Sequence, residues 1–132
     1  MVSRPHPLEV KLDLIDPPPG WGRVYRLGET INLIVRMRPL RDLEVREGRV
    51  ELVFAGGSNH KGDSNVHSSL TFLTNSRLYE ARTARCTVRL HVSPEPPPHA
   101  AEGTLKWRLV ATVEVPGTHD ISTERTVKIA LG

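Results

Sequence analysis

Apolar and polar residues alternate along most of this chain with a period of two. The alternation is clearest in residues 8–14, 30–38, 49–55, 70–72, 83–92, 105–115 and 126–131. A period of two is typical of a β-strand that buries one face and exposes the other. In no segment do apolar residues recur at helical spacing over the ten or more residues that a helix needs, so we predict no substantial helix.

Turn-forming residues separate these segments. The prolines at 17–19 and 96–98 remove successive backbone N–H donors, so both runs are predicted to lie in loops. Glu47-Gly48 is predicted to form a tight hairpin between residues 43–45 and 49–55. Seven to nine short strands with one apolar face each predict an all-β, antiparallel, immunoglobulin-like β-sandwich that spans residues 1–132 as a single domain.

Composition and charge narrow the function classes. The 132 residues carry 18 basic and 15 acidic side chains, and no apolar run approaches the roughly 20 residues that cross a bilayer. The basic residues are spread over the chain, so nucleic acid is not an expected partner. The N-terminus lacks a secretory pattern, and the single Cys86 can form no internal disulfide, which together favour a cytoplasmic location. We expect the thiol to be an inert part of the core.

Two blocks of sequence resemble the arrestin-like superfamily. In residues 24–35, Gly28-Glu29 precedes Ile31 and an amphipathic strand, and a second strand follows at 49–54. The second block comprises the strand at 86–92, a proline-rich loop, Gly103 and the aromatic strand at 105–111. The resemblance implies an arrestin-like sandwich, in which Gly28 permits a turn with positive φ ahead of the strand at residue 30.

The chain also departs from the superfamily that it resembles. Arrestins, the retromer cargo-binding subunit and the bacterial sporulation-control relatives carry two such sandwiches in tandem, whereas 132 residues hold one. A function that depends on two halves would therefore require two chains to associate. The lysine pair that senses phosphate in arrestins is not carried over, because the first strand has only Lys11 between Glu9 and Asp13.

No constellation for catalysis is recognisable. The six histidines show no i, i+2 or i, i+4 spacing, and no activated nucleophile or phosphate-binding glycine loop is present, so we expect no enzyme activity and no cofactor. Residues 59–67 contain His60, Asp63 and His67, which either bind zinc or belong to a solvated loop, and the loop is favoured. Trp107 is expected at the centre of the core. Trp21 either packs under its loop or faces a partner.

Two surfaces are candidates for binding. If residues 8–14, 30–38 and 83–92 share a sheet, its outward side carries a basic face made of Arg36, Arg38, Arg85 and Arg89. Such a face binds an anionic ligand or forms ordinary charge pairs with Glu9 and Asp13. If residues 49–55, 105–115 and 126–131 form the other sheet, its outward side carries an apolar self-association face made of Val53, Val110 and Ala130.

The sequence therefore favours a non-enzymatic protein-interaction, scaffold or adaptor module. Its partner is a protein that the sequence does not name, and a second copy of the chain is one candidate, which would make a homodimer that rebuilds a two-sandwich body. The alternative is a module that binds an anionic ligand, such as a phosphopeptide, a polysaccharide or an anionic membrane surface. Salt separates the two interpretations, because ionic binding weakens steeply as salt is added and apolar pairing does not.

Overall fold

The computed structural model describes residues 7–15, 24–56, 64–97 and 105–131. These residues form eight strands and no helix, and hence no helix among them is long and apolar enough to cross a membrane. The strands are β1 (Leu8–Leu14), β2 (Val24–Arg26), β3 (Thr30–Pro39), β4 (Leu43–Gly56), β5 (Ser64–Leu78), β6 (Ala84–His91), β7 (Leu105–Glu114) and β8 (Ile121–Ala130). Trp21, His6, His60, Asp63 and His99 lie outside the described residues.

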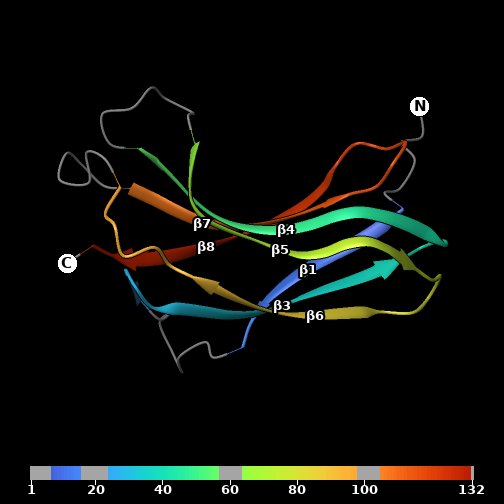
Figure 1. Ribbon diagram of the computed structural model, residues 1–132, viewed down its shortest axis with the longest axis horizontal. Coiled ribbons are helices and arrows are strands. Elements are labelled where there is room, and N and C mark those ends of the chain that lie inside the picture. The colour runs from blue at the N-terminus through green and yellow to red at the C-terminus, as the bar shows by residue number, and fades with distance from the viewer. Residues whose placement is uncertain (1–6, 16–23, 57–63, 98–104, 132) are drawn as a thin grey trace.

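The strands form two sheets that pack face to face, as Figure 1 shows. One sheet has the order β1-β3-β6 and is antiparallel throughout. The other has the order β2-β8-β7-β4-β5, and only the short pairing of β2 with β8 is parallel. This confirms the predicted β-sandwich and the predicted division of the strands between its two sheets.

The core follows from the alternation in the sequence. Ile31, Leu33, Val35 and Met37 point inward from β3 and are fully buried, and apolar residues of both sheets form one continuous cluster. Burial of such a side chain contributes about 1.5–3 kcal/mol, so the two inward faces hold the sheets together. Trp107 is buried as predicted, although it lies near the start of β7 and not at the centre of the strand.

The turn before β3 has the conformation that the arrestin-like block implies. Gly28 has a φ of +88°, where a glycine is favoured because it has no Cβ. Its N–H donates a hydrogen bond of 2.8 Å to the carbonyl of Val92, whose own N–H donates one of 2.8 Å to the carbonyl of Glu29. The turn is thereby fixed to the chain that follows β6.

The predicted hairpin at Glu47-Gly48 is wrong. Strand β4 runs without interruption from Leu43 to Gly56, and Gly48 lies inside it. A Cβ at Gly48 would stand 2.7 Å from Cζ of Phe72, so the missing side chain makes room for that ring. This glycine therefore reflects close packing between β4 and β5 and not a turn.

The loop predicted over residues 59–67 is also partly wrong. Residues 64–67 belong to β5, and His67 is half-buried there. The rings of His67 and Phe54 lie 5.2 Å from that of Trp107, centroid to centroid. Residues 59–63 lie outside the described part of the chain, so the zinc hypothesis is untested.

Candidate interaction surfaces

The outer face of the three-stranded sheet gathers basic side chains into a row. Arg36 on β3 is directly opposite Arg85 on β6, and on its other side it is directly opposite Lys11 on β1. We call these three residues the basic row. Arg38 lies two residues from Arg36 and opposite Glu9, whereas Arg89 lies opposite Asn32, away from the row. The structure therefore brings Arg36, Arg38 and Arg85 together and leaves Arg89 apart.

The basic row is only partly compensated by acidic groups. Nη2 of Arg36 forms an ion pair with Oδ2 of Asp13 at 2.5 Å. Nη1 of Arg38 lies 4.0 Å from Oε2 of Glu9. Among the described residues, Lys11 and Arg85 have no ion pair, and Nε of Arg36 is buried without a hydrogen-bond partner. Like charges placed directly opposite each other on neighbouring strands are destabilising, so an anion here would relieve a local cost.

A small hollow lies beside the row. It has a volume of about 110 Å³ and is lined by Glu9, Lys11, Arg36, Arg38 and Thr83. Three cations and one carboxylate therefore face it. This arrangement suits a group the size of a single phosphate more than an extended polymer.

The outer face of the five-stranded sheet carries the residues predicted for self-association. Val53 is outside the core cluster yet only 7% exposed, and it lies opposite Val66 of β5 and Arg108 of β7. Val110 is half-buried on β7, opposite Glu51 and diagonal to Val53. Ala130 is paired with β2 at the other side of the sheet. Val53 and Val110 are thus neighbours, and Ala130 is not.

Charged residues adjoin this apolar pair. Nη1 of Arg49 donates hydrogen bonds to Glu114 at 3.0 Å and Glu47 at 3.3 Å, and its Nε donates to Glu51 at 3.2 Å. Burial acts to lower the pKa of Arg49, but the hydrogen bonds and the charges of Glu114 and Glu51 outweigh it, so the pKa is raised. One cation is therefore shared by three carboxylates.

The free edge of β5 was missed by the sequence analysis. β5 is 15 residues long and is the outermost strand of its sheet, so only one side of its backbone pairs with β4. Of the residue types Lys, Arg, Asp and Glu, β5 contains only Arg77, which lies close to the end of the strand. β5 contains no proline. Val66 is 54% exposed and Leu70 is 39% exposed. The signal that could have revealed this edge is the run of Ser, Thr and Asn without charge.

The pairing of β5 with β4 is irregular in two places. Register shifts occur between Gly48 and Arg49 and between Leu52 and Val53. Between them, residues 68–71 pair regularly with 49–52. Residues 73–78 also pair in one register, but they include Arg77 and Asn75, whose φ is +42°. Bulges, charge and irregular backbone disturb an edge, so residues 68–71 are the part of β5 best able to accept another strand.

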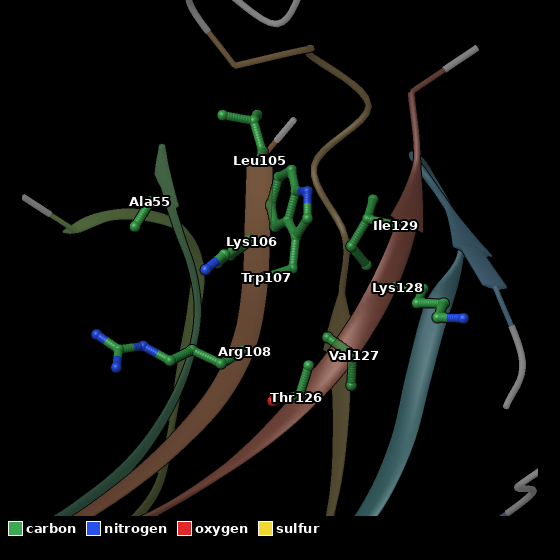
Figure 2. Close-up of a pocket in the computed structure, with 9 residues that line it drawn as sticks. All are labelled: Ala55, Leu105, Lys106, Trp107, Arg108, Thr126, Val127, Lys128 and Ile129. Atoms are coloured by element: carbon green, nitrogen blue, oxygen red, sulfur yellow. The ribbon is translucent and has the colours of Figure 1, made fainter. Parts of the chain in front are cut away.

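A groove opens where β7 and β8 separate, and Figure 2 shows the residues that line it. Its volume is about 680 Å³. The apolar residues Leu105, Trp107, Val127 and Ile129 come from both strands, and Lys106 and Lys128 add positive charge. The sequence analysis did not find this groove, because it depends on where two strands stop pairing.

No catalytic centre stands out in the described part of the chain. There, no group of three or more His, Cys, Asp or Glu side chains could hold a metal ion. Burial raises the pKa of the Cys86 thiol, which keeps it protonated and makes it a poor nucleophile at neutral pH. Among the described residues, the surfaces above offer no activated group.

Comparisons with known proteins bear on the fold. No protein-family model matches the sequence, and a search of curated proteins gives no match. Among solved structures, the chain is similar to the crystal structure of Spo0M, a sporulation control protein from Bacillus subtilis, with a TM-score of 0.73 and 12% sequence identity. The match covers 92% of this chain and 49% of that one, so this chain spans about half the length of Spo0M. The chain therefore has the arrestin-like sandwich fold that its two sequence blocks predicted.

Proposed function

We propose that this chain is a non-enzymatic protein-binding module that pairs with a second copy of itself through the free edge of β5. The observation that carries this proposal is the length of that edge and its lack of charge. Proteins normally protect a long edge strand with lysines, prolines or a covering segment, because unpaired backbone groups bind other strands. β5 has bulges but neither proline nor lysine.

A second copy is the occupant that suits this edge. Antiparallel pairing of β5 with the β5 of a partner is self-complementary, so a two-fold axis closes the assembly after one contact. Residues 68–71 would supply main-chain hydrogen bonds, and the exposed Val66 and Leu70 would be covered. Such a dimer would contain two sandwiches, as arrestin-like relatives do within one chain.

Light scattering coupled to size-exclusion chromatography tests this proposal. The wild-type chain is expected to elute with the mass of a dimer at high concentration and to dissociate on dilution. Ser69→Lys adds one charge to the exposed regular stretch of β5 and should give a monomer at every concentration. Ser122→Lys, at an exposed position on β8 of the same sheet, is the matched control and should leave the dimer intact. A wild-type chain that stays monomeric overturns the proposal.

A second candidate function is supported by the basic row. Two of its three cations have no ion pair among the described residues, and a buried Nε of the third has no partner. We propose that the row and its hollow bind one phosphate group on a phosphorylated peptide. Arginine favours this chemistry because its planar guanidinium donates paired hydrogen bonds to phosphate.

Matched arginines on β6 test this second function. A phosphoserine peptide and its unphosphorylated form are titrated into the chain by calorimetry, with inorganic phosphate as a separate probe. Arg85→Gln should weaken phosphopeptide binding about tenfold, which corresponds to one charge-assisted contact of about 1.4 kcal/mol. Arg89→Gln, on the same strand but away from the row, should have little effect. Equal binding of both peptides would exclude a phosphate site.

A further inference from the structure

Strands β7 and β8 stop pairing before either of them ends. Their register begins at Trp107 opposite Val127. Beyond that pair, and among the described strands, β7 continues to Leu105 paired with β4 alone, and β8 continues to Ala130 paired with β2 alone. In Figure 2 the two strands diverge on either side of Trp107. We call this opening the β7–β8 split.

Two like charges would meet if the pairing of β7 with β8 continued. If the register continued by one residue, Lys106 would lie directly opposite Lys128. Like charges directly opposite each other on paired strands are destabilising. Both lysines are exposed, and no ion pair involves either of them within the described residues. The three-stranded sheet keeps such a pair between Arg36 and Lys11, so the repulsion between the lysines adds to the separation but does not alone set it.

The split offers three kinds of contact at once. No strand of the described part of the chain pairs with the facing backbone edges of Leu105–Lys106 and Lys128–Ala130, so among these residues their main-chain groups have no strand partner on those sides. The inward positions are apolar, namely Leu105, Trp107, Val127 and Ile129, and the outward positions are Lys106 and Lys128. The volume of about 680 Å³ lies within the range of ligand-binding sites.

We infer that the β7–β8 split binds an extended peptide segment of a partner protein in which acidic and apolar side chains alternate. Because successive side chains of a strand point to opposite faces, the apolar ones would face the half-buried Leu105 and Ile129 beside the buried Trp107. An acidic one would lie between Lys106 and Lys128. The backbone of the segment would bridge the two unpaired edges, which is the mode of recognition called β-augmentation. The acidic group would also cancel the repulsion between the two lysines.

This inference is independent of self-association. The split lies between β7 and β8, whereas the free edge of β5 lies beyond β4, so neither surface uses residues of the other. A failure of peptide binding would leave a dimer unaffected. A monomeric chain could in turn still bind the peptide.

The test uses an acetylated, amidated pentapeptide Val-Glu-Val-Glu-Val and its counterpart Val-Lys-Val-Lys-Val. Trp21→Phe leaves Trp107 as the single tryptophan, so its fluorescence reports binding in the split. The glutamate peptide is expected to give a saturable change, and the lysine peptide none. Lys128→Glu should lower the affinity for the glutamate peptide at least about tenfold. Lys11→Glu changes a lysine of the other sheet and should leave that affinity unchanged.

A reversal of charge makes the test independent of any loss of folding. The double variant Lys106→Glu/Lys128→Glu should bind the lysine peptide and reject the glutamate peptide. Methylation of the peptide's central backbone nitrogen should abolish binding, because it removes a main-chain donor. The inference would be overturned by equal binding of both peptides or by the absence of a saturable signal. Dodecanoate, an anionic fatty acid without a peptide backbone, is a third probe, and it would overturn the inference if it bound as tightly as the glutamate peptide.

Discussion

Among single residues, Gly48 has the sharpest steric requirement. A Cβ there would approach Cζ of Phe72 to 2.7 Å and Cε2 to 2.9 Å, inside the contact distance of two carbon atoms. We expect Gly48→Ala to lower the free energy of unfolding by about 1–3 kcal/mol, because the Phe72 ring must leave its packed position. Urea denaturation measures the loss. In a double-mutant cycle with Phe72→Leu, the two losses should not add, and strict additivity would contradict the steric explanation.

Arg49 is a second residue whose role can be measured. It is the single cation between Glu47, Glu51 and Glu114, and its side chain is 29% exposed. In Arg49→Gln the three carboxylates repel one another, and we expect a loss of about 1–2 kcal/mol in the free energy of unfolding at pH 7. Urea denaturation measures this loss, and Arg49→Lys, which keeps the positive charge, should lose less. An equal loss in both variants would show that the guanidinium acts through packing.

At the scale of elements, side chains of β5 fasten the two sheets together at one open side of the sandwich. The hydroxyl of Ser68 accepts a hydrogen bond of 3.0 Å from the N–H of Ser93, and Nε2 of His67 lies 3.0 Å from the carbonyl of the same residue. Ser68→Ala should cost about 0.5–1.5 kcal/mol of stability and accelerate hydrogen exchange of the Ser93 amide. Ser69→Ala, one residue along and exposed, is the control. Equal exchange at Ser93 in both variants would contradict this role.

The period of two in the sequence predicts some strands and misses others. Strands β3, β6 and β7 were predictable because each packs one face on the core and leaves the other outside. The full extent of β5 was not, because its serines and threonines suit either face and its two register shifts break the period. β2 was not predicted either, since three residues are too short for a period.

Part of the candidate surfaces could likewise be predicted from the sequence, and part could not. A period of two places Arg36, Arg38, Arg85 and Arg89 on one face whatever their partners are, so the basic face could be predicted from the sequence. The alignment of Arg36 with Lys11 and Arg85 depends on register, which no local pattern specifies. The β7–β8 split depends on register too. Lys106 and Lys128 are 22 positions apart in the chain, and they come near each other because the adjacent residues Trp107 and Val127 are paired.

For the whole molecule, self-association should make stability depend on concentration. If two folded chains pair through β5 and unfolded chains do not, mass action favours the folded state as the chain becomes more concentrated. Each tenfold increase then adds up to about 1.4 kcal/mol per dimer, or about 0.7 kcal/mol per chain, and raises the Tm by roughly 2–4 °C for a domain of this size. Scanning calorimetry across two decades of concentration measures this slope. Ser69→Lys should remove the slope while its Tm matches that of the dilute wild type, because the position is exposed in the single sandwich. A Tm that does not vary with concentration in the wild type would mean that one sandwich is stable without a second.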